Sequence, residues 1–281
     1  MSSIIEVIQK RTSVRSYSDE KLDVAKKEEL TDFLRHISQG PFGNALRFQM
    51  VEVPEGNESE LRKLGTYSMI RGAFLYLAGA VCRGERAMED YGYCMESVVL
   101  KATELGIGTC WLGGSLDRSV FAARIGLGPQ ELIPAVSPLG IPGTKSTWLV
   151  TLLGTSRGTR NRKKPEELFY KGEAGQPMDL SNFGPYHTVL ESVRLAPSAR
   201  NKQPWRIIKE DGRDTYHFFM DEDEGYNRSR GEIRIQNVDM GIAMCHFALS
   251  AQALSLNGRL TVESEHLEAP GLVYVASWVS K

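Results

Sequence analysis

The chain has 281 residues, of which 41% are hydrophobic and 25% are charged, a balance that is ordinary for a soluble globular protein with one large or two smaller cores. Lys and Arg number 34 against 35 Asp and Glu, so the net charge of −1 creates no global field that favours nucleic acid, and any anion needs a local cluster of cations. The first residues are too charged for a signal peptide, and the sequence holds no apolar run of about 18 residues. We therefore expect a cytoplasmic protein without a membrane span.

The four cysteines lie in apolar stretches and form no CxxC pair, which predicts reduced core thiols rather than a disulfide framework. They are Cys82, Cys94, Cys110 and Cys245. The five histidines are scattered, and no Cys/His spacing typical of a metal site occurs, so no metal is expected.

Helix and strand signals alternate irregularly along the chain. Ser3 and Glu6 have capping-box spacing at the start of a first helix, and a second helix follows Asp23 and stops at the turn signal Gly40-Pro41. Strands are predicted at 48–53, 74–81, 147–153, 206–208, 215–220 and 272–279. Because helices and strands do not alternate strictly, the pattern predicts an α+β fold rather than a doubly wound parallel sheet.

Two segments of the first half recur in the second half, which predicts an internal duplication. A helix followed by PFGNALRF matches a helix followed by PSARNKQPW, with the first prolines 156 residues apart. Asp90-x-Gly92 opens a helical stretch, and Asp239-x-Gly241 does the same 149 residues later. We expect a first half at 1–160, a linker at 161–185, which is polar and rich in Gly and Pro, and a second half at 186–281. The alternative is two unrelated α+β halves.

The segment Arg11-Thr12-Ser13-Val14-Arg15 follows the first helix directly. Two guanidinium groups and two hydroxyls within five residues form a compact donor cluster that suits a phosphate dianion. The alternative is a solvated helix end, where arginine compensates the helix dipole.

The segment GIGTCWLGG, residues 106–114, follows the helix that begins near Asp90. Gly113 and Gly114 allow the backbone to approach a flat ligand closely, although the spacing is not that of a dinucleotide-binding loop. Read alone, the segment indicates a helix cap followed by a turn.

The segment APSARNKQPW, residues 196–205, places Ser198, Asn201 and Gln203 on one loop. Neutral donors and acceptors of this kind suit a polyol chain or the edge of a heterocycle rather than a metal or a phosphate. The alternative is a polar loop that its own side-chain hydrogen bonds hold in place.

Together, RTSVR, GIGTCWLGG and APSARNKQPW resemble three signature segments of the FMN-dependent nitroreductase family. The resemblance implies the nitroreductase-like α+β fold, which is typically a homodimer with FMN at its interface. The first half carries a degraded PFGNALRF in place of the Pro-Ser loop, and the second half lacks RxSxR. The chain therefore resembles the fused branch of the family, in which two homologous halves form an internal pseudo-dimer, act as a monomer and keep one complete site.

The resemblance also implies roles for particular residues. The FMN phosphate is expected at Arg11, Thr12, Ser13 and Arg15, with a further cation from Arg160, Arg162 or Lys163. The isoalloxazine and ribityl groups are expected at Pro197, Ser198, Asn201 and Gln203. Leu112, Gly113 and Gly114 are expected to pack beside the ring, with a backbone N–H there reaching flavin N5. Tyr67 and Arg71 are also expected near the ring.

The implied function is that of an oxidoreductase that passes a hydride from NAD(P)H through FMN to an electron-poor small molecule such as a nitroaromatic or a quinone. The flavin supplies the chemistry, so no catalytic side chain is expected. Alternatives are a flavin-binding or sensing protein without turnover, and another flavin reaction such as dehalogenation or flavin reduction. Nucleic-acid binding through the basic run at 157–164 is disfavoured by the near-zero net charge.

Overall fold

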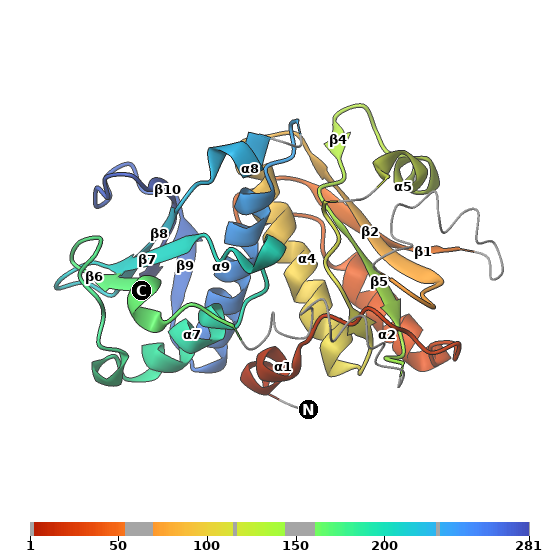
Figure 1. The fold of residues 1–281 in the computed structure, drawn as a ribbon, viewed down its shortest axis with the longest axis horizontal. Coiled ribbons are helices and arrows are strands. Elements are labelled where there is room, and N and C mark those ends of the chain that lie inside the picture. The colour runs from red at the N-terminus through yellow and green to blue at the C-terminus, as the bar shows by residue number, and fades with distance from the viewer. Residues whose placement is uncertain (1–2, 54–69, 115–116, 144–160, 229–230, 281) are drawn as a thin grey trace. The chain divides into compact units, whose positions relative to one another are not determined.

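The computed structural model describes residues 3–53, 70–114, 117–143, 161–228 and 231–280. The chain divides into two units. The N-terminal unit comprises Lys10–Ala87 and Cys94–Gly158, and the C-terminal unit comprises Met1–Gln9, Met88–Tyr93 and Thr159–Lys281. Both contain a mostly antiparallel sheet with helices, so the α+β prediction is confirmed (Figure 1).

The N-terminal unit is built on a sheet with the order β1-β2-β5-β3. Its strands are β1 (Leu46–Glu52), β2 (Leu75–Cys82), β3 (Gly108–Thr109) and β5 (Val136–Gly140), and β4 (Glu131–Leu132) pairs with β2. All these pairings are antiparallel. The helices α2 (Val24–Arg35) and α5 (Arg118–Ile125) pack against β1, and α5 also contacts β2.

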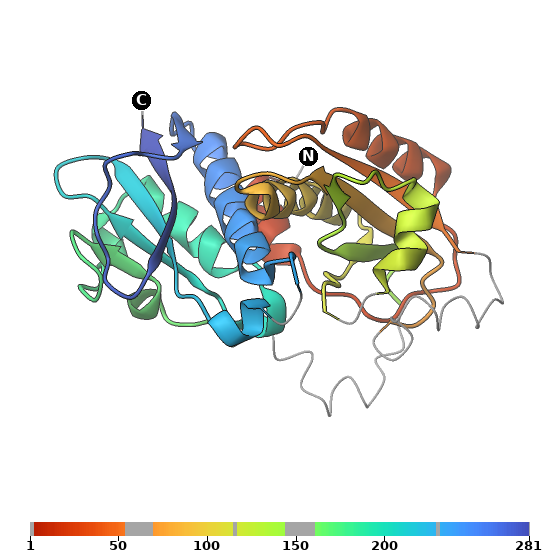
Figure 2. The ribbon, with the colours of Figure 1, turned by 90° about the horizontal axis from the view of Figure 1, so that it is seen from above.

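The C-terminal unit is built on a sheet with the order β6-β7-β8-β10-β9. Its strands are β6 (Phe169–Lys171), β7 (Trp205–Lys209), β8 (Thr215–Met220), β9 (Gly258–Thr261) and β10 (Val273–Ser280). The helix α7 (Pro185–Arg194) packs against α9 (Ile235–Ala253), and α9 contacts β7 and β8 (Figure 2). Helices α1 (Ile4–Lys10) and α8 (Glu224–Arg228) complete the unit. Most of α9 is buried because its side chains are small or apolar on nearly every side.

The predicted helix starts are confirmed where a capping side chain is present. Ser3 Oγ accepts a hydrogen bond from Glu6 N at 3.3 Å ahead of α1. Asp23 Oδ1 accepts from Ala25 N at 3.0 Å and from Lys26 N at 3.3 Å ahead of α2. These bonds satisfy amide groups that have no partner within the helix.

Two expectations about helix ends are wrong. Helix α2 ends at Arg35 rather than running to Gly40, because residues 36–39 leave the helix and Gln39 pairs with Ala45 in an isolated bridge. Asp90 and Asp239 do not open their helices, since α4 (Ala87–Glu104) and α9 begin three and four residues earlier and both carboxylates are buried. A buried Asp within a helix gives the same sequence signal as a capping one.

The segment 161–185, expected as a linker, contains strand β6, which pairs in parallel with β7. Phe169 of β6 is buried, as are Leu168 and Met178, so this part of the segment belongs to the core of the C-terminal unit. The predicted strand at 147–153 lies outside the described residues.

The first two turns of α4 and of α9 pack closely inside the C-terminal unit. A Cβ on Gly92 would lie 2.1 Å from the carbonyl oxygen of Val238, and a Cβ on Gly241 would lie 2.0 Å from that of Glu89. Asn237 Nδ2 also donates to Glu89 Oε1 at 2.7 Å. The glycines therefore allow backbone to pack on backbone, in two contacts between the same pair of helical turns.

Candidate functional site

The arginine cluster and the glycine segment lie side by side in the N-terminal unit. Val14 N donates to Thr109 O at 2.8 Å, and Ser13 and Thr109 form a parallel bridge. A Cβ on Gly108 would lie 3.0 Å from the Val14 side chain, so glycine permits this approach. Two segments that are nearly 100 residues apart in the sequence are thus joined by backbone hydrogen bonds.

The residues that follow the cluster are held in an extended conformation from both sides. Arg71 N donates to Arg15 O and Tyr17 N donates to Arg71 O, both at 2.9 Å, while Gly143 N donates to Ser16 O at 2.9 Å. Burial raises the pKa of the Tyr17 hydroxyl, which donates to Val14 O at 2.7 Å. The backbone that presents Ser13 and Arg15 is therefore fixed by its neighbours.

Exposure differs sharply within the cluster. Thr12 and Ser13 are exposed and Arg15 is half-buried, whereas Arg11 is 5% exposed. Arg11 Nε lies 3.9 Å from Glu96 Oε1, too far for a hydrogen bond, and among the described residues this buried nitrogen has no hydrogen-bond partner. A buried guanidinium is thus only partly compensated.

The buried thiol of Cys110 lies near the arginine cluster. Burial raises its pKa, while Arg15, Arg11 and the Ser13 hydroxyl act in the opposite direction. All three side chains are therefore close enough to Cys110 to influence its charge. The two arginines and the Ser13 hydroxyl therefore favour the anionic form of this thiol, but burial outweighs them.

The end of the glycine segment is held by the sheet and by one arginine. Leu112 and Val136 exchange two backbone hydrogen bonds of 2.9 Å. Arg118 donates to Gly113 O at 2.7 Å, to Ile133 O at 2.9 Å and to Pro134 O at 3.0 Å. Leu112 is buried, Gly113 is half-buried and Gly114 is exposed, so the segment reaches the surface at its second glycine.

In the C-terminal unit, the loop between α7 and β7 carries unusual backbone conformations. Arg200, Asn201 and Gln203 have φ angles of 50°, 56° and 48°. Residues other than glycine are uncommon at positive φ, and such conformations persist only where the surroundings impose them. Three within four positions mark this loop as one whose shape is held against local preference.

Several hydrogen bonds impose that shape. Gln203 N donates to Ser198 Oγ at 2.9 Å, and Gln203 Nε2 donates to Asn201 O at 3.0 Å. Ala199 N donates at 3.0 Å to Oδ1 of Asp239, which is buried in α9. Pro197 is buried at the start of the loop.

The candidate cations at 162 and 163 lie against this loop. Arg162 donates to Asn201 Oδ1 and, at 2.9 Å, to Leu195 O. Lys163 N donates to Gln203 Oε1 at 2.8 Å, and Asn201 Nδ2 donates to Asn161 O at 2.7 Å. Burial and the neighbouring Arg206 lower the pKa of the Lys163 ammonium. The amides of Asn201 and Gln203 are therefore engaged in hydrogen bonds within the unit.

The predicted site residues thus form two groups. The N-terminal unit brings the arginine cluster to the glycine segment, and the C-terminal unit brings residues 161–163 to the Pro-Ser loop. Tyr67 and the first half of the basic run at 157–164, which includes Arg160, lie outside the described residues. Glu96 and Arg118 were not predicted from the sequence, and Asp239 was expected only as the start of a helix. The signal available for Glu96 was an acidic residue within a largely apolar helix.

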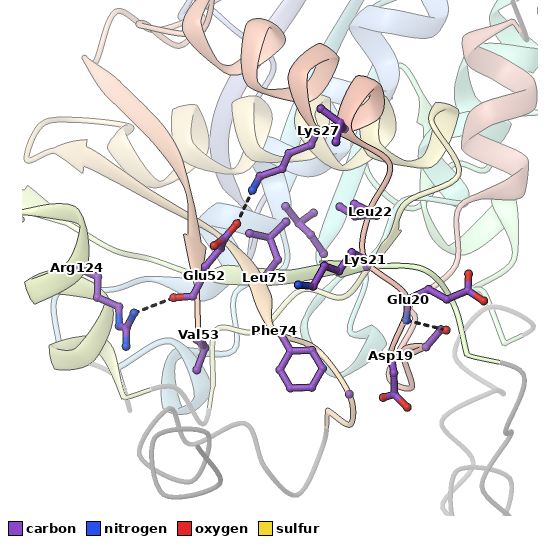
Figure 3. Close-up of a pocket in the computed structure, with 15 residues that line it drawn as sticks. Asp19, Glu20, Lys21, Leu22, Lys27, Glu52, Val53, Phe74, Leu75 and Arg124 are labelled. Carbon is purple, nitrogen blue, oxygen red and sulfur yellow. Dashed lines mark hydrogen bonds and ion pairs between the residues drawn. The ribbon is translucent and has the colours of Figure 1, made fainter. Parts of the chain in front are cut away.

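The N-terminal unit also contains a cavity of about 680 Å³ (Figure 3). Lys27 forms an ion pair with Glu52 at its wall, and Arg124 donates to Glu52 O at 2.8 Å. None of the residues that line this cavity belongs to the predicted cofactor site. Its wall carries charges of both signs together with the apolar side chains of Leu22, Phe74 and Leu75.

Comparison with known protein families decides the family. The family described as "Putative TM nitroreductase" matches residues 3–251. The chain belongs to this nitroreductase family. The resemblance that the three sequence segments indicated is confirmed.

One solved structure agrees with this fold over nearly the whole chain. A "putative nitroreductase" from Thermotoga maritima is 20% identical, covers 99% of this chain and 94% of its own, and superposes with a TM-score of 0.62. A "putative nitroreductase in complex with fmn" from Desulfovibrio desulfuricans is also 20% identical, but it covers 54% of this chain and 95% of its own, with a TM-score of 0.41. A nitroreductase family protein from Clostridium difficile 630 is 19% identical over 52% of this chain and 88% of its own, with a TM-score of 0.40.

The search among curated proteins gave no match. Within the described ranges, no helix combines the length and the apolar character needed to cross a membrane.

Proposed function

We propose that this nitroreductase family member binds FMN and works as an NAD(P)H-dependent oxidoreductase. In this proposal Arg11, Ser13 and Arg15 bind the phosphate, with Thr12 beside them and Arg162 or Lys163 as a further cation. The segment Leu112–Gly114 binds the ring. The loop residues that bind the ring and the ribityl chain are Pro197, Ser198, Asn201 and Gln203. Family membership and the shape of these two segments support the assignment.

The observation that carries the proposal is the state of Arg11. Its guanidinium is buried, its Nε has no hydrogen-bond partner among the described residues, and the carboxylate of Glu96 is 3.9 Å away. A buried charge with incomplete compensation is costly, and a phosphate with several oxygens would supply the missing acceptors. The exposed hydroxyl of Ser13 and the half-buried Arg15 provide further donors. The residues present therefore fit a phosphate group.

When bound, FMN would supply the two-electron chemistry that takes a hydride from NAD(P)H and delivers it to an electron-poor acceptor such as a nitroaromatic or a quinone. The contribution of the protein is binding and orientation. Arg15 and Ser13 would hold the phosphate end, and a backbone N–H at Gly113 or Gly114 would face the ring. Asn201 and Gln203 keep the Pro-Ser loop in its strained shape through the hydrogen bonds described above.

We propose further that the chain is an internal pseudo-dimer of two homologous halves, 1–160 and 186–281, that acts as a monomer with one FMN. The helix crossing supports this proposal, because its two contacts are equivalent under the repeat. Positions 92 and 89 correspond to positions 241 and 238 at the repeat offset of 149 residues, so the contact Gly92–Val238 is the counterpart of Gly241–Glu89. Such reciprocity is the mark of a two-fold interface. The free cysteines among the described residues are in keeping with a cytoplasmic location.

The proposal is tested on the purified protein by its absorbance spectrum, before and after incubation with FMN and dialysis. We expect a flavin spectrum at one FMN per chain that bleaches within the turnover time when NADPH or NADH is added under nitrogen, and recovers with a quinone or a nitroaromatic. Protein that retains no FMN would overturn the proposal. Retained FMN that neither nicotinamide bleaches would identify a flavin-binding protein without turnover.

A further inference from the structure

Glu96 lies in α4 and is fully buried. Its two carboxylate oxygens face two different segments of the N-terminal unit. Oε2 accepts a hydrogen bond from Trp111 Nε1 at 2.7 Å, and Oε1 lies 3.9 Å from Arg11 Nε. One buried carboxylate therefore lies between the arginine cluster and the glycine segment.

The two partners occupy positions next to the candidate cofactor residues. Arg11 is the first residue of the cluster, and Trp111 directly precedes Leu112 and Gly113. Movement of the Glu96 carboxylate would therefore change the position of both segments. Its side chain is 0% exposed and that of Arg11 is 3% exposed, so water does not screen their interaction strongly.

We propose that Glu96 is a positioning residue that fixes the phosphate-binding arginine and the ring-binding segment in one arrangement. This inference rests on the proposed function, because it assigns Arg11 to the FMN phosphate. Glu96 itself touches neither the phosphate nor the ring in this proposal. It acts through Arg11 and Trp111.

The chemistry of the pair explains why a carboxylate is required. Trp111 and Arg11 are both donors without acceptor capacity, and they face separate oxygens of one side chain. A glutamine at position 96 has the same shape but only one acceptor oxygen. If that oxygen accepts from Trp111, its NH₂ group faces the Arg11 guanidinium. Glu96→Gln should therefore disturb Arg11 even though the side chain still fits.

Removing the indole donor should rescue the Glu96→Gln variant. Trp111→Phe removes the indole donor, so the amide oxygen at position 96 of the double variant is no longer held by the indole and can turn toward Arg11. We therefore expect E96Q/W111F to recover phosphate recognition that E96Q alone has lost. A buried group with a purely structural role would instead show additive losses.

The experiment compares the dissociation constants of FMN and riboflavin by flavin-fluorescence titration, because only FMN carries the phosphate. Wild type, E96Q, W111F and E96Q/W111F are measured, with E104Q as the matched control at the C-terminal end of α4, where Lys101 keeps Glu29 as a second partner. We expect E96Q to lower the FMN preference over riboflavin about tenfold, the size of one charge-assisted contact. W111F should weaken both flavins alike, the double variant should regain most of the preference, and E104Q should match wild type.

A second measurement applies if E96Q does not fold. Inorganic phosphate is added to wild type and to W111F, and the difference in tryptophan emission isolates Trp111. We expect a saturable change, because phosphate on Arg11 alters the Glu96 carboxylate that Trp111 contacts. Three results would each overturn the inference: an unchanged FMN preference in folded E96Q, additive losses in the double variant, or no change in Trp111 emission when phosphate is added. Wild type that binds neither flavin would overturn the proposed function as well, so the two failures are distinguishable.

Discussion

Asp239 Oδ1 accepts a hydrogen bond from the backbone N–H of Ala199 at 3.0 Å, while Oδ2 is buried and has no hydrogen-bond partner among the described residues. Burial raises the pKa of the Asp239 carboxyl well above its ordinary range, and the single N–H donor only partly opposes this effect. The strained loop that carries Asn201 is therefore anchored to a carboxyl group that favours its neutral form.

This anchoring predicts a pH-dependent benefit of Asp239→Asn. An acid whose pKa is raised on folding stabilises the protein fully below its unfolded pKa of about 4 and loses that contribution as the pH rises through the folded value. Asparagine still accepts from Ala199 N but never ionises. We expect the melting temperature of D239N, relative to wild type, to increase as the pH is raised from about 4 toward neutrality.

The control is Asp32→Asn on the exposed side of α2, which should show no such trend. A constant difference between D239N and wild type across this pH range would mean that Asp239 is not held in its neutral form. Asp239→Ala should lower the melting temperature at every pH, because it leaves the Ala199 N–H without its acceptor.

Arg15→Ala should weaken FMN binding by about 1.5–3 kcal/mol, the range for a hydrogen bond to a charged group. Arg15 is half-buried beside Cys110, so its charge is not fully screened by solvent. The measurement is FMN retention through dialysis followed by fluorescence titration. Arg35→Ala on the exposed end of α2 is the control and should retain wild-type affinity. Unchanged retention in R15A would refute the phosphate assignment.

Arg162 and Asn201 should be energetically coupled. The guanidinium donates to Asn201 Oδ1, and the same amide donates to Asn161 O at 2.7 Å. A double-mutant cycle with R162A and N201A, measured by urea unfolding, should give a coupling energy of about 1.5–3 kcal/mol. The Arg194–Glu191 pair, which is partly exposed on α7, should give less than about 1 kcal/mol. Equal coupling energies for the two pairs would contradict the prediction that the Arg162–Asn201 hydrogen bond is the stronger interaction.

Gly92→Ala and Gly241→Ala should each destabilise the protein by about 1–3 kcal/mol, because the new methyl group would meet a backbone carbonyl. Once one substitution has separated the helical turns, the second has less to displace. The double variant should therefore cost less than the sum of the two single variants in thermal unfolding. Gly225→Ala in α8 is the control: its nearest neighbour, Asp223 Oδ1, is at 3.7 Å, so little change is expected. Strict additivity would indicate two independent sites.

Local signals in the sequence predicted much of the fold. Strand β8 occupies the predicted 215–220, and β2 and β10 are shifted from their predicted ranges by one residue. Asp23 and Ser3 cap helices as their spacing indicated. These features depend on periodicity and on side chains that bond to nearby backbone, so a short window contains the information.

Features that depend on distant partners were missed. Strand β6 has few residues and a polar neighbourhood, and it forms because β7 offers an open edge for parallel pairing. Glu96, Arg118 and Asp239 matter through partners that are 15 or more residues away or through several backbone carbonyls at once. The sequence predicted which segments form the candidate site, but it could not show that Asn201 and Gln203 are committed to hydrogen bonds within their own unit.

The contacts made by Gly92 and Gly241 have a genetic consequence. In an assembly of two identical chains, one codon specifies both copies of such a glycine, so any substitution changes both contacts of the helix crossing. Here the two glycines are encoded by two different codons of one gene. Each can be altered while its counterpart is left intact, and the tolerance of the crossing can be measured one contact at a time.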